Sequence, residues 1–210
     1  MAVYSQSAFL PEGNSGFGFS GGYSTDENTH GVGVGVAFCF SGIVDVGIDF
    51  TNGEAKDDSI SAIILSPFIR VFLLRQKGTM PISFSLSADY VAGTYDNDVI
   101  DEFGLDVTSA GISIGGTIYK KFDVSPSFSI MPTVRVAYYT YTLSLEDPSG
   151  FFPNEEEKFS IPSLGAGLSL IADIDKSVFF SFVTSFSLSE DSIGMGVGVA
   201  LYYGFSPGSV

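Results

Sequence analysis

The chain has 210 residues and a formal net charge of −15; 45% of its residues are hydrophobic but only 16% are charged. Ordinary soluble domains are roughly 25% charged, so this chain lacks the charge that would hydrate the surface of a soluble globule. Its most apolar runs, such as residues 69–74, stop well short of the roughly 18 residues of a transmembrane helix. The acidic balance opposes nucleic-acid binding, and strands with one apolar face account for the composition better than helices do.

Large apolar residues alternate with small or polar ones along most of the chain, and a period of two predicts β-strands. Residues 31–40, for example, carry valine and phenylalanine at even positions and small residues at odd ones. The pattern predicts one domain of ten strands within residues 14–205. In chain order, the predicted strands cover residues 14–23, 30–40, 43–51, 59–74, 79–95, 107–119, 122–142, 159–173, 177–188 and 193–205.

Two of these segments are weaker than the rest. Residues 59–74 are apolar on both faces, and we expect Arg70 to point inside. The side chains expected to point outward there are Ile63, Leu65, Ile69, Val71 and Leu73. Residues 122–142 contain Pro126 and Pro132, each of which removes a ladder hydrogen bond, so bulges are expected. Merging the two weak segments leaves eight strands as the alternative.

The polarity of the two strand faces predicts the surroundings of the sheet. Glycine and serine on the small face cannot supply the charged coat of a soluble protein, whereas large apolar side chains facing lipid and small ones facing a lumen suit a membrane barrel. Because backbone groups inside a bilayer must all be paired, such a sheet has to close. The sequence therefore predicts an all-β fold, a closed antiparallel up-and-down transmembrane β-barrel. The rival is a soluble ligand-binding barrel, which would be monodisperse without detergent.

The connections between the predicted strands differ in length on the two sides. Those on one side are 41–42, 75–78, 119–123 and 173–176, and those on the other are 24–29, 51–58, 95–106, 144–158 and 189–191. Short periplasmic turns and longer external loops are typical of bacterial outer-membrane barrels, which have an even strand number. Aromatic residues near the strand ends predict two interfacial girdles. These are Tyr23, Phe50, Tyr90, Tyr138 and Phe186 outside, and Phe17, Phe38, Phe40, Tyr203 and Phe205 on the periplasmic side.

The last predicted strand carries apolar residues at alternate positions and closes on an aromatic one. The residues concerned are Val197, Val199, Leu201, Tyr203 and Phe205. This pattern resembles the assembly signal of bacterial outer-membrane β-barrel proteins, although in that superfamily the aromatic residue is usually the final one, whereas here a tail of residues 206–210 follows. The resemblance implies an outer-membrane location, contact with the lipid bilayer and lipopolysaccharide, and the barrel assembly machinery as a partner. It identifies no subfamily.

The first 13 residues lack the basic segment and long apolar core of a secretory signal peptide. If the protein is exported, we expect this chain to be the mature form with an added Met1. Residues 1–13 then form a periplasmic arm or a plug, for which Tyr4, Phe9 and Leu10 supply apolar side chains.

Most of the 24 acidic residues fall in the predicted external loops. Residues 96–102 and 154–157 hold enough oxygen ligands for divalent cations that also bridge lipopolysaccharide phosphates, but neither segment follows an EF-hand spacing. Hydrated loop charge is the favoured interpretation, and no metal ligand is assigned.

The alternation also places charged side chains inside the barrel, where each must be paired or hydrated. They are Asp45, Asp49, Arg70, Asp89 and Arg135. Two interpretations stay open. In one, these charges line a constriction that sets the selectivity of a passive channel for small solutes. In the other, they form a salt-bridged plug in a closed structural or surface-interaction barrel that acts through its acidic loops. The Gly- and Ser-rich lining favours the channel.

The sequence gives little support to an enzyme. The chain has one histidine, His30, shortly after Asp26 and Glu27. Omptin proteases, which are ten-stranded outer-membrane barrels, pair acidic residues with a histidine at the external rim, but this chain is much shorter and has no second matching motif. The glycine-rich residues 31–36 lack the lysine and helix of a P-loop. We predict no catalytic residue, no cofactor, and a packed thiol at Cys39.

Overall fold

The computed structural model describes residue 10 and residues 13–56, 60–76, 81–151, 153–175, 177–189 and 192–205. Its elements are β1 (Ser15–Thr25), β2 (Thr29–Phe40), β3 (Val44–Ala55), β4 (Ser61–Leu74), β5 (Ser83–Asp96), α1 (Asp98–Phe103), β6 (Asp106–Tyr119), β7 (Phe122–Ser125), β8 (Phe128–Glu146), β9 (Glu155–Asp175), β10 (Val178–Ser189) and β11 (Ile193–Phe205). No helix in this described part is long and apolar enough to span a membrane.

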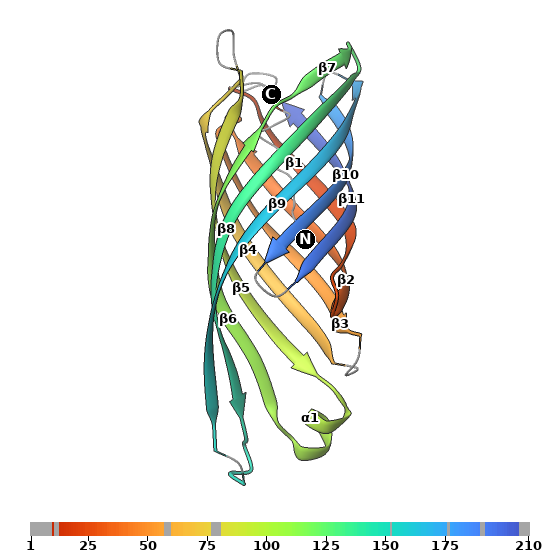
Figure 1. Ribbon diagram of the computed structural model, residues 1–210. Helices are drawn as coiled ribbons and strands as arrows, with labels where there is room; N and C mark the ends of the chain where they lie inside the picture. Colours follow the sequence, from red (N-terminus) through yellow and green to blue (C-terminus); the bar gives the residue numbers. More distant parts are fainter. Residues whose placement is uncertain are drawn as a thin grey trace.

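The strands form one closed antiparallel barrel (Figure 1). Each long strand pairs with its neighbours in the chain, β1 pairs with β11, and β6 pairs with β8. The barrel wall therefore has ten strands, with β7 as an additional short strand against β8. The prediction of ten strands is confirmed, and the eight-stranded alternative is wrong because β4 and β8 are separate strands.

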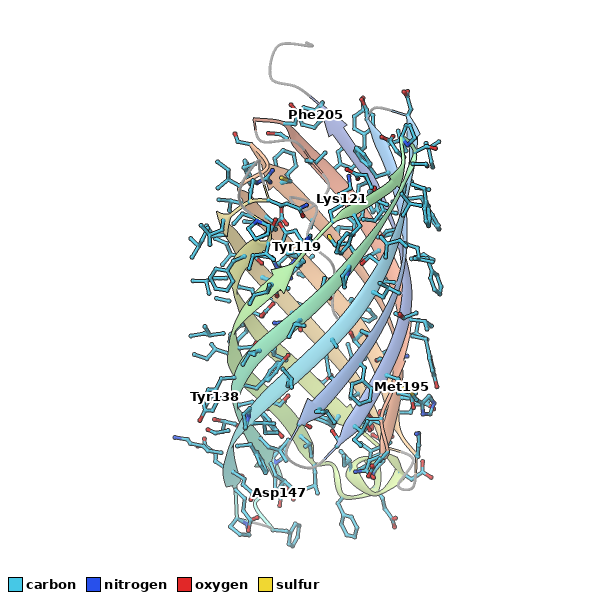
Figure 2. The ribbon with its side chains drawn as sticks, turned by 45° about the horizontal axis from the view of Figure 1, so that its top comes forward. Tyr119, Lys121, Tyr138, Asp147, Met195 and Phe205 are labelled. Atoms are coloured by element: carbon cyan, nitrogen blue, oxygen red, sulfur yellow. The ribbon has the colours of Figure 1, made fainter. Side chains whose placement is uncertain are left out.

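The two ends of the barrel differ in what they carry. β1 begins and β11 ends at the end that holds β7, called here the β7 end and drawn at the top of Figure 1. The opposite end holds α1 and the connection between β8 and β9, and is called the α1 end. In Figure 2, Phe205 lies at the β7 end and Asp147 at the α1 end.

Alternation along each strand gives the barrel an apolar outside. Val32, Ile114 and Met195 are 58%, 59% and 62% exposed, whereas Ser113 and Ser181 on the opposite faces of their strands are fully buried. β4 follows the expected orientation, with Ile63 and Leu73 exposed and Arg70 buried. Large side chains stand off the outer wall in Figure 2. A continuous apolar outer surface of this kind suits lipid as its solvent.

The predicted aromatic girdles lie on this outer face. The five residues of the external girdle are each 40% exposed or more. Near the β7 end, the ring centroids of Phe17 and Tyr203 lie 5.4 Å apart. The ring centroid of Phe38 lies 4.5 Å from that of Phe40 and 6.3 Å from that of Phe205. The aromatic residues of the last strand thus contact those of the first two strands across the seam that closes the barrel.

The path of the chain between β6 and β8 differs from the predicted one. The predicted turn at residues 119–123 is wrong: the chain continues into β7 and turns at residues 126–127. Pro126 lies in that turn and not in a bulge. Pro132 lies in β8 opposite the break between β6 and β7. There its carbonyl accepts a hydrogen bond from the backbone amide of Lys120 at 3.3 Å. A proline suits this place because the chain opposite is already irregular.

The connections alternate in length less regularly than predicted. The connection between β4 and β5 covers residues 75–82, because β5 begins at Ser83 and not at residue 79. At the α1 end, β1–β2 and β10–β11 are joined by short segments, residues 26–28 and 190–192. The predicted loop 95–106 contains helix α1, which starts after Asn97, whose side chain accepts the Ile100 amide at 2.7 Å, and ends at Gly104 with φ 62°. An N-cap asparagine and a left-handed glycine are the sequence signals that mark it.

Candidate functional site: the lumen

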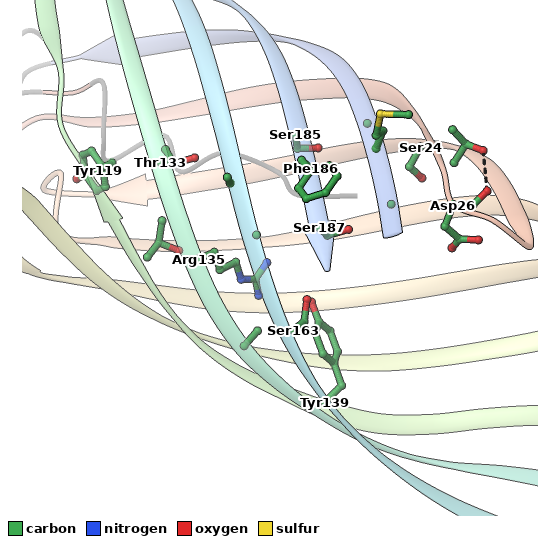
Figure 3. A pocket seen from close by; sticks show the side chains of 18 of the residues that line it. Ser24, Asp26, Tyr119, Thr133, Arg135, Tyr139, Ser163, Ser185, Phe186 and Ser187 are labelled. Carbon is green, nitrogen blue, oxygen red and sulfur yellow. Dashed lines mark hydrogen bonds between the residues drawn. The ribbon is translucent and has the colours of Figure 1, made fainter. Parts of the chain in front are cut away.

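Two cavities open into the barrel from the α1 end. The wide cavity, of about 610 Å³, is lined mainly by β2–β6 and β8. The deep cavity, of about 300 Å³, is lined mainly by β8–β11 and reaches Tyr119 and Met131 (Figure 3). The two linings share six residues: Ser24, Thr29, Arg135, Tyr139, Ser163 and Ser187. The cavities are therefore adjoining parts of one hollow lumen.

Arg135 on β8 and Asp89 on β5 form an ion pair across the lumen. The Arg135 Nη2 atom lies 3.2 Å from Asp89 Oδ2, and the two side chains are 22% and 17% exposed. Ser113 on β6 donates a hydrogen bond to the same carboxylate at 3.2 Å, and Arg135 also donates to Ser87 at 3.4 Å. The pair ties β5, β6 and β8 together from inside, and Figure 3 shows Arg135 projecting into the deep cavity.

Asp45 and Arg70 lie opposite each other in the register of β3 and β4. Asp45 is fully buried and Arg70 is 8% exposed. The Arg70 guanidinium lies 5.5 Å from the centre of the Phe68 ring, and the residue lines the deep cavity. Opposite charges on neighbouring strands offset part of the cost of burying each other.

Asp49 is the fifth residue expected in the lumen, and it lines the wide cavity. It is half-buried and faces Ser66 across the β3–β4 register. Its Oδ1 atom is buried and has no hydrogen-bond partner among the described residues. The structure thus brings Asp89 and Arg135 together, sets Asp45 opposite Arg70, and leaves Asp49 apart from both arrangements.

An apolar layer fills the lumen towards the β7 end, and the alternation of the sequence does not predict it. It consists of Leu10, Cys39, Phe72, Tyr119, Met131, Ile171, Phe179, Ala200 and Tyr202. The Gly- and Ser-rich lining, which favours an open channel, therefore does not extend to this end. One signal was visible in the sequence: Tyr202 interrupts the run of glycine and alanine on the inner face of β11. Cys39, expected to be packed, is fully buried in this layer.

Leu10 is the part of this layer that comes from outside the barrel strands. Its side chain is 3% exposed, and its carbonyl accepts a hydrogen bond from Arg75 Nη1 at 2.9 Å. Gly204 and Gly16 make room for it, since a Cβ at either position would overlap the Leu10 side chain. The other proposed plug residues, Tyr4 and Phe9, and the tail 206–210 lie outside the described residues.

His30 is not paired with Asp26 in the structure. Its Nε2 atom lies 3.5 Å from Glu54 Oε2 on β3. The Asp26 carboxylate instead accepts hydrogen bonds from the backbone amides of Asn28 at 2.8 Å and Thr29 at 2.7 Å, and from the Thr29 hydroxyl at 2.8 Å. Burial alone would raise the pKa of Asp26, but these hydrogen bonds and the charge of Lys56 outweigh burial and hold the pKa below its usual range. Asp26 is thus occupied in shaping the β1–β2 turn.

Where the chain is described, no cluster of three or more His, Cys, Asp or Glu side chains is arranged to hold a metal ion. The divalent-cation hypothesis for the acidic loops stays a prediction.

No protein-family model matches the chain, and no curated protein matches its sequence. Solved structures of similar shape are known. The translocator domain of the autotransporter NalP from Neisseria meningitidis superposes with a TM-score of 0.60 at 10% identity, over 93% of this chain and 90% of that one. The β domain of the Bordetella autotransporter BrkA gives a TM-score of 0.57 at 9% identity, over 91% of this chain and 99% of that one.

An outer-membrane channel from Pseudomonas putida F1 gives a TM-score of 0.53 at 8% identity, over 98% of this chain and 100% of that one. Identities this low carry information about the fold alone. The three superpositions, the closed pairing of ten strands and the apolar outer face together establish the fold. The chain has the fold of bacterial outer-membrane β-barrel proteins.

Proposed function

We propose that the protein is an outer-membrane channel through which small solutes diffuse passively. The hollow lumen carries this proposal: the wide and deep cavities adjoin each other and extend from the α1 end as far as Arg70, Tyr119 and Met131. Their walls are rich in serine, threonine and glycine, which favour water over packed apolar side chains. The apolar outer face supports a bilayer as the surroundings.

We propose an orientation in the membrane from the same topology. We place the α1 end outside the cell and the β7 end in the periplasm, with both strand termini at the periplasmic side. The apolar wall then contacts lipid, and the acidic connections at the α1 end lie beside lipopolysaccharide, where divalent cations can bridge the two. The last strand, with Val197, Tyr203 and Phe205 on its outer face, serves as the signal for the barrel assembly machinery.

In this proposal the charged residues of the lumen act as the selectivity filter. Arg135 and Arg70 stand beside the deep cavity, while Asp49 and Asp89 stand beside the wide cavity. A permeating ion passes these side chains at close range in a low-dielectric barrel, where each charge acts strongly. Removing either arginine leaves a carboxylate in excess and shifts the preference towards cations.

The apolar layer represents a closed state of the proposed channel. A path to the periplasm requires this layer to open, and Leu10 is its one member that does not belong to a barrel strand. Residues 1–13 therefore act as a plug that holds the layer closed.

A closed barrel that acts through its acidic loops is the second candidate. The observation that favours it is the full packing of the apolar layer, in which Met131, Ile171 and Tyr202 are only 1–2% exposed. These side chains belong to the wall and remain when Leu10 is removed.

Single-channel recording in a planar bilayer tests the proposal and separates the two candidates. We expect discrete current steps that are rare in the full chain and frequent after deletion of residues 2–13 or in Leu10→Ala. Arg70→Ala and Arg135→Ala should raise the preference for cations, whereas Glu102→Gln, an exposed change on α1, should not. Silence from the full chain and the deletion, with folding shown by heat-dependent gel mobility, would contradict the channel and favour the closed barrel.

A further inference from the structure

The charges around the wide cavity do not balance. Its lining contains three carboxylates, Asp49, Glu54 and Asp89, against one arginine, Arg135, and one histidine, His30. Arg135 is engaged by Asp89, and His30 lies beside Glu54. Asp49 is therefore the carboxylate of this lining for which the described residues provide no ion pair.

The surroundings of Asp49 make its negative charge costly to leave alone. One carboxylate oxygen, Oδ1, is covered by protein and accepts no hydrogen bond from any described residue. A half-buried carboxylate without a hydrogen-bond donor loses hydration, and the charges of Arg70 and Arg135 offset only part of this loss. A cation reaching the side of Asp49 that faces the cavity would offset this loss, whereas an anion would add to it.

Aromatic side chains line the same cavity. They are Tyr95 on β5 and Tyr139 and Tyr141 on β8. The Tyr95 hydroxyl is hydrogen-bonded to Ser109 at 3.1 Å, and the Tyr141 ring stacks on Phe159 with the centroids 5.0 Å apart. Figure 3 shows Tyr139 beside Arg135 and Ser163. Rings held in this way offer fixed faces to an apolar group and to a positive charge.

We propose that the wide cavity binds a primary ammonium that carries a small apolar or aromatic body. The ammonium binds the carboxylate of Asp49, and the body packs against Tyr95, Tyr139 and Tyr141. An anion is disfavoured here, because the Nη2 group of Arg135 already donates to Asp89 and Ser87 and the Nε group is buried in the wall. This inference names the solute class of the proposed channel, and it rests on that function in taking the α1 end as the entrance.

Binding of three matched probes by calorimetry in detergent micelles tests this site without requiring conduction. Benzylamine is cationic at neutral pH, benzyl alcohol is neutral, and benzoate is anionic. We expect the full chain to bind benzylamine about tenfold or more tightly than either other probe. Asp49→Asn should weaken benzylamine binding by a similar factor, while Asp101→Asn, an exposed change on α1, should leave it unchanged.

Benzoate binding as tightly as benzylamine, or no benzylamine binding to the full chain, would overturn the inference even if Asp49→Asn failed to fold. Benzylamine binding without any channel current would contradict the proposed channel and leave the site standing.

Discussion

At the scale of single residues, Gly204 and Gly16 decide whether Leu10 can lie inside the barrel. Both glycines face the lumen near the β7 end, and their missing side chains leave the space that Leu10 occupies. Glycine inside a strand usually marks a place where another group approaches the backbone closely. Here that group is a side chain from the segment that precedes the first strand.

Gly204→Ala should destabilise the folded barrel, because the new Cβ overlaps the Leu10 side chain. Overpacking of this kind typically costs about 1–3 kcal/mol, measured here as the free energy of unfolding by urea in detergent. Gly21→Ala is the matched control, since the nearest atom to its Cβ would be the Gly33 carbonyl oxygen at 3.8 Å. Combining Gly204→Ala with Leu10→Ala should recover part of the loss; strictly additive effects of the two changes would contradict the contact.

The sequence predicts the lumen residues only as far as alternation reaches. The odd or even position of a residue in its strand, called parity here, assigns Asp45, Asp49 and Arg70 to the inner face without any knowledge of the fold. It cannot tell which inner-face residues meet, because the ion pair of Asp89 with Arg135 joins positions 46 residues apart. Parity also assigns Phe72 and Phe179 to the inner face, but which end of the lumen they fill depends on strand register and tilt.

At the scale of elements, the β1–β2 turn is organised by one carboxylate. Asp26 accepts three hydrogen bonds from Asn28 and Thr29, and its main-chain carbonyl accepts a hydrogen bond from Lys56. An Asx-type arrangement of this kind fixes a short turn by bonding backbone amides two and three residues ahead.

The Asp26 turn should be less stable at low pH. Its folded-state pKa is lowered from 3.8, so the ionised carboxylate contributes stability above about pH 4, and this contribution is lost as the pH falls through the lowered value. Asp26→Asn should therefore speed amide hydrogen exchange at Asn28 and Thr29 at neutral pH, with a difference from the unmodified chain that shrinks below pH 3.8. A difference that grows on acidification would show that the sign is wrong.

The last strand carries the proposed assembly signal, and its final aromatic residue is the place to test it. Phe205→Ser should lower the amount of protein inserted in the outer membrane of a Gram-negative host, while purified protein still refolds in detergent. Phe40→Ser is the control, because Phe40 belongs to the same girdle, is 50% exposed and lies outside β11. Equal losses for both variants would assign Phe205 to the girdle and remove its role in assembly.

The elements were predictable wherever the alternation was regular. β2, β10 and β11 lie within two residues of the segments that the sequence predicts. The errors fall where another principle acts. Pro126 lies inside a predicted strand although proline also suits a turn, and the six-residue helix α1 is too short for its periodicity to be detected.

At the scale of the whole molecule, the barrel is hollow at one end and packed at the other. The composition explains the hollow part, since glycine and serine cannot fill a ten-stranded interior. The packed part needs large side chains from strands that are distant in sequence, such as Phe72, Tyr119 and Phe179, to meet at one level. That meeting is set by the stagger of the strands, which the sequence pattern leaves undetermined.

Reaction of introduced cysteines with a cationic thiol reagent measures this division of the lumen directly. In a Cys39→Ser background, Ser187→Cys lies on the wall shared by both cavities, and Ala200→Cys lies in the apolar layer. We predict fast labelling at position 187 and at least about tenfold slower labelling at position 200, with the two rates approaching each other after deletion of residues 2–13. Equal rates in the full chain would contradict the apolar barrier, and protection of both positions would contradict the hollow lumen.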